Sequence, residues 1–110
     1  MNKKKSMVDT NRILFEKIIE DAIIDCYGED EQIAGWACLL EENIPVPCKC
    51  LIGEEPVTLN KIEQGENSNV IFGKIKFEKI KIRIPIGDIT LEDPETMKYI
   101  EAYDYWRKNG

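Results

Sequence analysis

The stretch VIFGKIKFEKIKIRIPI at residues 70–86 alternates between apolar and charged side chains for most of its length. Successive side chains of a β-strand point to opposite faces, so this period of two predicts two strands, each with one apolar face. The residues predicted to face inward are Ile71, Ile75 and Phe77 on the first strand and Ile80, Ile82 and Ile84 on the second. Those predicted to face outward on the second are Lys79, Lys81 and Arg83. A strand pattern with one apolar and one charged face favours an antiparallel sheet.

The same period extends over residues 45–89 and predicts two further strands. One carries alternating apolar residues at Val46, Cys48, Cys50 and Ile52, and the next begins at Val57 after a turn at GEEP, residues 53–56. Several short antiparallel strands in a chain of 110 residues favour a strongly bent sheet or a small barrel, because closure removes exposed edges. We place this barrel at about 45–90, within a single domain at residues 10–110.

Helical patterns flank the predicted sheet. Apolar residues recur every three to four positions from about 10 to 27, which predicts an amphipathic helix that ends near Gly28. A second helix is predicted at about 30–43, with an acidic first turn that suits the helix dipole. Asp93 followed by Pro94 predicts the start of a third helix, at about 94–108. Residues 1–9 are rich in lysine and are predicted to form a flexible basic tail.

Charge and cysteine usage narrow the classes of partner. The net charge is -6, which argues against nucleic acid or an anionic membrane as the main partner and favours a cation. We find neither a signal peptide nor a membrane span, and expect a cytoplasmic monomer. Only Cys48 and Cys50 form a close pair, whereas a structural zinc site needs two such pairs. We therefore expect free thiols in a reducing compartment.

The two N-terminal helical segments concentrate negative charge. Residues 16–42 contain nine acids and one lysine, and four of the acids lie within DCYGEDEQ at residues 25–32. Acidic runs are commonly solvated surface. Glu41 and Glu42, however, are predicted at the end of a helix where the dipole disfavours carboxylates. Local rules that are broken without a compensating gain tend to mark functional sites, and a bound cation would supply that gain.

Calcium is the cation that this arrangement suits, because it accepts six to eight oxygen ligands in flexible geometry. The turn between the helices offers the carboxylates of Asp25, Glu29, Asp30 and Glu31, together with the carbonyl oxygen of Tyr27. The spacing does not match an EF-hand loop. Glu41 and Glu42 would lie about 15 to 18 Å further along a straight helix, so we assign them to a second, weaker site.

A longer series of residues resembles a known family. The residues that carry this resemblance are Asp25-x-Tyr27, Glu29 to Gln32, Gly35-Trp36, Leu40-Glu41-Glu42-Asn43, Pro45, Ile84-Pro85-Ile86 and Tyr105-Trp106. Over about residues 22–106 the chain is similar to the small bacterial calcium-binding proteins of the CcbP type. The resemblance implies an α+β fold in which a small SH3-like antiparallel β-barrel carries two N-terminal helices and a C-terminal helix. It also implies that acidic side chains bind Ca²⁺ without an EF-hand, as a buffer or a sensor.

Two other classes of function remain open at this point. Small SH3-like barrels commonly bind peptides or nucleic acids, and the basic strand face that includes Lys74, Lys76 and Arg83 could serve that role. A solvated strand face explains the same residues more simply. We do not expect an enzyme, because the sequence lacks histidine, a nucleophile motif and a glycine-rich phosphate loop.

Overall fold

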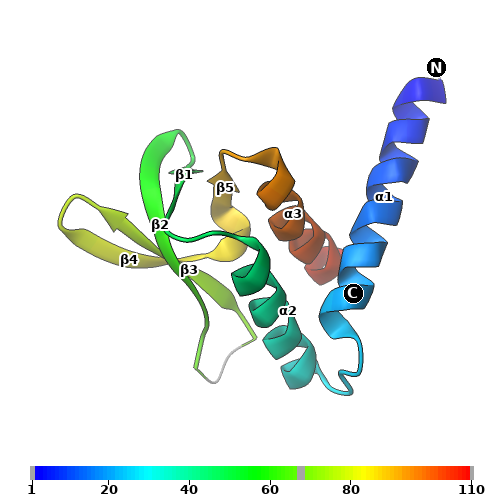
Figure 1. The fold of residues 1–110 in the computed structure, drawn as a ribbon, viewed down its shortest axis with the longest axis horizontal. Coiled ribbons are helices and arrows are strands. Elements are labelled where there is room, and N and C mark those ends of the chain that lie inside the picture. Colours follow the sequence, from blue (N-terminus) through cyan, green and yellow to red (C-terminus); the bar gives the residue numbers. More distant parts are fainter. Residues whose placement is uncertain (1, 67–68, 110) are drawn as a thin grey trace.

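The computed structural model describes residues 2–66 and 69–109, with side chains described from Asn11 onward. These residues form three α-helices and five strands (Figure 1). Their order is α1 (Asn2–Ile23), α2 (Glu29–Asn43), β1 (Cys48–Ile52), β2 (Glu55–Gln64), β3 (Ile71–Phe77), β4 (Ile80–Pro85), the 3-10 turn η1 (Ile86–Asp88), β5 (Ile89–Leu91) and α3 (Pro94–Asn109). None of the described helices is both long enough and apolar enough to cross a bilayer.

The five strands form one antiparallel sheet in the order β4-β3-β2-β1-β5. The predicted α+β class is therefore confirmed. The predicted barrel is not, because the sheet is not closed: over the described ranges β4 pairs only with β3, and β5 pairs only with β1. β5 contains only three residues, so it offers few backbone groups to pair with a further strand. In Figure 1 the helices lie together on one side of the sheet, and the β3–β4 hairpin extends away from them.

The core lies between the helices and the inner face of the sheet. Its fully buried side chains include Trp36 and Leu40 from α2 and isoleucines from the sheet and α3. Trp36 packs edge-on against Tyr103 and also contacts Trp106, with ring centroids 5.5 and 5.8 Å apart. Aromatic pairs at such distances add to the stability that burial provides. This cluster joins α2 to α3 and thereby fixes both helices beside the α1–α2 turn.

Most of the predicted strand faces are correct, but β4 differs. Ile71 and Ile75 are buried, as predicted, and Lys81 and Arg83 are exposed. Ile80, Ile82 and Phe77, predicted to face inward, are instead 57%, 45% and 38% exposed. They do lie on the same face as the buried isoleucines, because the register pairs Ile82 with Ile75. That face, however, is left partly open in the distal part of the hairpin.

The helix boundaries agree closely for α2 and α3 and less well for α1. The structure makes residues 2–9 the first part of α1, where the sequence predicted a tail. This segment contains neither proline nor glycine, so nothing in it interrupts a helix. α1 ends at Ile23, earlier than predicted, and Gly28 is the N-cap of α2 instead of the end of α1.

Candidate metal centre

A short reversal of the chain joins α1 to α2. Asp25 has a left-handed backbone with φ of 61°, and the N–H of Cys26 donates a hydrogen bond of 3.0 Å to the carbonyl oxygen of Ile23. Aspartate tolerates this conformation better than most residues do. On α2, Gly35 packs so closely against α1 that a Cβ atom there would collide with the carbonyl oxygen of Ala22. This close approach holds the two helices together immediately beside the turn.

Four carboxylates lie on this turn and on the first turn of α2. Asp25, Glu29, Asp30 and Glu31 are all exposed, and none of them forms a salt bridge with a described cation. Within residues 25–31, the N–H of Tyr27 donates a hydrogen bond of 3.2 Å to Oε2 of Glu31. The Tyr27 side chain itself is 88% exposed. The turn thus offers uncommitted oxygen atoms to a cation in solvent.

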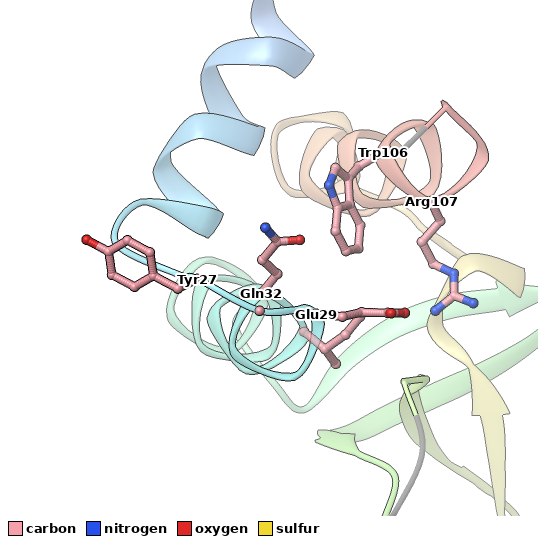
Figure 2. A pocket seen from close by; sticks show the side chains of 7 residues that line it. Tyr27, Glu29, Gln32, Trp106 and Arg107 are labelled. Atoms are coloured by element: carbon pink, nitrogen blue, oxygen red, sulfur yellow. The ribbon is translucent and has the colours of Figure 1, made fainter.

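Glu29 also faces a surface hollow between the start of α2 and the end of α3. The hollow has a volume of about 470 Å³. Its lining residues are Tyr27, Gly28, Glu29, Gln32, Ile33, Trp106 and Arg107. Figure 2 shows Tyr27 turned away from the side of the hollow on which Trp106 and Arg107 lie. Only Tyr27 and Glu29 of the predicted ligands therefore border it.

Sequence reasoning missed two polar residues near Glu29. Asn69 Nδ2 donates a hydrogen bond of 2.9 Å to Oε1 of Glu29, and Arg107 donates to the carbonyl oxygen of Asn69 and, at 3.1 Å, to the Tyr103 hydroxyl. Asn69 is 40 positions from Glu29, and no periodicity or motif links the two. Arg107 adds positive charge beside the hollow, but its described hydrogen bonds go to neutral oxygen atoms.

The structure separates Glu41 and Glu42 from the turn. Both lie exposed in the last turn of α2, where none of the residues is basic. At 1.5 Å per residue, about 18 Å of helix lies between Glu29 and Glu41. One ion cannot contact both ends. That Glu41 and Glu42 bind a second ion stays a prediction.

In its described part, the chain contains no group of three or more histidine, cysteine, aspartate or glutamate side chains already arranged around one point. The acids of the turn therefore do not form a preassembled cage. Like charges that are close and unscreened repel one another, and exposed side chains are free to separate. Calcium accepts variable ligand number and geometry, so it is a cation that such adjustable oxygen ligands can bind.

Of the four cysteines, only Cys26 lies in the acidic turn. All four are free, and Cys50 is only 1% exposed. Burial raises the pKa of the Cys50 thiol to about 11, with smaller contributions from the nearby Cys48 and Glu92. Burial and Glu92 also raise the pKa of Cys48. Both thiols of this pair therefore remain protonated near neutral pH, unlike the thiolates that bind zinc.

The fold and the turn define a small α+β protein with exposed, unpaired carboxylates suited to a hard divalent cation. A family model described as calcium binding, for proteins of the CcbP type, matches residues 16–107. The chain belongs to this family and binds calcium. Both the resemblance seen in the sequence and the predicted ion, Ca²⁺, are thereby confirmed.

Two solved structures are similar to this chain. The crystal structure of CcbP from Anabaena matches with a TM-score of 0.72 and 18% sequence identity, over 86% of this chain and 89% of the other. A calcium-binding protein in its calcium-binding form matches with a TM-score of 0.71 and 16% identity, over 88% and 91% of the two chains. No curated protein matches the sequence. At these identities the structures establish a shared fold.

Proposed function

We propose that calcium binds at the α1–α2 turn, through the carboxylates of Asp25, Glu29, Asp30 and Glu31 and the carbonyl oxygen of Tyr27. The observation that carries this proposal is that none of the four acids has a described cationic partner. Elsewhere in the described chain, acids such as Glu63 and Asp104 do form salt bridges. The turn therefore keeps negative charge available, which offsets the cost of dehydrating the ion.

The contacts at the turn support a binding mechanism in which the site closes around the ion. The hydrogen bond from the Tyr27 N–H holds the Glu31 carboxylate beside the segment between the helices, and the one from Asn69 restrains Glu29. Asp25 and Asp30 supply further carboxylates that move toward the ion as it neutralises their repulsion. Asn69 acts as a positioning residue, because its amide contacts Glu29 and is not counted among the ligands.

The second part of the proposal concerns Glu41 and Glu42. Their position at the negative end of α2, without a basic residue in that turn, supports a separate and weaker calcium site. Only two carboxylates are involved, so most of the ligands would be water. We expect this site to fill at higher calcium concentration than the turn.

The family and the fold support a role as a calcium buffer and not as an enzyme. A calcium sensor needs an element that switches between two states when the ion binds. We identify no such element in the described structure. Four free thiols fit a reducing cytoplasmic environment. The return of β5 to pair with β1 supports an SH3-like arrangement of the strands, in an open form.

Calcium titration calorimetry on three variants tests the location of the site. Asp25→Asn and Glu29→Gln keep an oxygen atom at each position but remove a full negative charge, so each should weaken calcium binding by about tenfold or more. Glu66→Gln is the matched control, because Glu66 is an exposed acid outside the turn. Equal affinities for all three variants and the unmodified protein would exclude the turn as the site.

A further inference from the structure

The β3–β4 hairpin contrasts in charge with the rest of the molecule. Residues 71–85 contain five basic residues and one acid, Glu78, in a chain whose net charge is -6. β4 is an edge strand, because it pairs only with β3 within the described residues. Its apolar residues Ile80 and Ile82 are exposed. An open sheet edge presents unpaired backbone N–H and C=O groups, to which an extended segment of another protein can add as a strand. Lysines on such an edge discourage pairing with most strands, so a partner strand has to supply acidic side chains.

The register places like charges directly opposite one another. Lys74 pairs with Arg83, and Lys76 pairs with Lys81. The first pair is bridged by Glu63, whose carboxylate lies 3.1 Å from Arg83 and 3.9 Å from Lys74. The second has no described carboxylate within salt-bridge distance. Like charges directly opposite destabilise a sheet, so the Lys76–Lys81 pair costs stability without a visible compensation.

Proline identifies which backbone groups of β4 face the open edge. Pro85 pairs with Phe72 and has no N–H to donate, so in this ladder its nitrogen has to point away from β3. Backbone groups along an antiparallel strand alternate in direction, and Lys81 and Arg83 share the phase of Pro85. Their N–H and C=O groups therefore point to the open edge. Residues in this phase also have their side chains closer to the opposite strand, which increases the repulsion between Lys76 and Lys81.

We propose that the edge of β4 binds an extended segment of a partner protein in which acidic and apolar residues alternate. Backbone hydrogen bonds to Lys81 and Arg83 would hold the segment as a sixth strand. Its acidic side chains would lie on the face that carries Lys76 and Lys81, and its apolar side chains would cover Ile80 and Ile82. The bound acids would thereby supply the missing partners of the two lysines.

The same features disfavour other occupants. A second copy paired through β4 would place Lys81 and Arg83 beside the same cations of its partner. A bilayer is flat and would contact only one face of the hairpin, whereas the apolar and basic residues lie on opposite faces. Nucleic acid would meet the long-range repulsion of the acidic remainder of the chain. An alternating strand is the occupant that uses the edge and both faces.

Binding of a defined peptide tests this proposal. The probe is a labelled, acetylated and amidated eight-residue peptide of alternating glutamate and valine, measured by fluorescence anisotropy on the full chain. Lys81→Glu should weaken binding by about tenfold, because it replaces attraction by repulsion at one cross-strand position. Lys49→Glu is the matched control: Lys49 lies in the same cross-strand row on β1, separated from β4 by β2 and β3, and should leave binding unchanged.

Amide hydrogen exchange tests the geometry. With the peptide bound, the exchange of Lys81 and Arg83 should slow, while that of Ile82, whose N–H faces β3, should not change. A peptide of the same composition in block order, four glutamates then four valines, should bind more weakly. Failure of the alternating peptide to bind, equal binding of the block peptide, or equal losses in both variants would overturn the proposal. So would tighter, Lys81-dependent binding to phosphatidylglycerol vesicles or single-stranded DNA.

Discussion

The α1–α2 turn and the β3–β4 hairpin each crowd charges of one sign, negative in the turn and positive in the hairpin. The turn gathers Asp25, Glu29, Asp30 and Glu31 without a described cationic partner, and the hairpin places Lys76 opposite Lys81 without a described anionic one. Neighbouring charges in the same molecule are neutralised, as where Glu63 bridges Lys74 and Arg83. The protein therefore can compensate crowded charges and does not do so at these two places.

The two regions differ in how their charged side chains are arranged in space. The acids of the turn lie close together in sequence on a short segment where the chain reverses, which suits a single small ion. The cations of the hairpin follow a straight strand beside an open edge, which suits an extended segment. The sign of the uncompensated charge indicates the sign of the ligand, and its geometry indicates the size of the ligand.

The largest expected effect is stabilisation by calcium. An ion that binds the native turn and not the unfolded chain adds about 2.7 kcal/mol to the free energy of unfolding at a hundred times its Kd. Thermal unfolding with calcium or with chelator should show this difference. Magnesium should stabilise less, because it requires a rigid octahedral shell and releases water reluctantly.

Hairpin and turn variants sharpen that result. Asp25→Asn should lose most of the calcium-dependent rise in Tm, whereas Lys81→Glu should keep it, because the hairpin is not part of the site. Equal rises with calcium and magnesium in every variant would instead indicate general screening of acidic charge.

The next effect in size concerns a buried thiol of the core, Cys50 on β1. The pKa of Cys50 is raised to about 11 from 9.0 in the folded state, so the folded protein holds this proton more tightly. The protonated thiol therefore contributes on the order of 1 kcal/mol to the free energy of unfolding. This contribution is complete below about pH 9 and is lost as the pH rises toward 11. Urea unfolding at pH 8 and pH 10 should therefore show a smaller pH-dependent loss for Cys50→Ala than for Cys38→Ala.

Cys38 provides the matched control because it is exposed on α2 and its thiol is accessible in both states. If both alanine variants lose equal stability between pH 8 and pH 10, the buried thiol is not the source of the pH dependence.

The smallest effect is relief of crowding in the protein without calcium or partner. Asp25→Asn in the turn and Lys81→Glu in the hairpin should each raise the free energy of unfolding, by roughly 0.2 to 1 kcal/mol. Both gains should shrink at high salt, because exposed charges are screened. Lys49→Glu should give no comparable gain, and a gain equal to that of Lys81→Glu would argue that overall charge matters more than the opposed lysines.

The periodicity of the sequence predicted the helices and strands better than it predicted whether the sheet closes into a barrel. The helix at α2 and the proline-initiated start of α3 follow from local signals, and the alternation of Ile and Lys located β3 and β4 correctly. Whether the sheet closes depends on contacts between its edges, which no local pattern records. The exposure of Ile80 has the same origin, because it depends on where the helices end above the sheet.

The site was predictable in part for a similar reason. The acidic turn is a local feature, so its residues could be named from the sequence. Asn69 and Arg107 come from segments about 40 and 80 positions away from Glu29. Only in the folded chain does Asn69 contact Glu29, and Arg107 contact Asn69. A single sequence carries no signal for such meetings.

A crystal structure grown in calcium tests the location of the ion most directly. We predict an ion at the α1–α2 turn, with oxygen atoms of Asp25, Glu29 and Glu31 about 2.3 to 2.6 Å away. The carbonyl oxygen of Tyr27 should point toward it. An ion held only by Glu41, Glu42 or other acids, with the turn still open to solvent, would contradict this account.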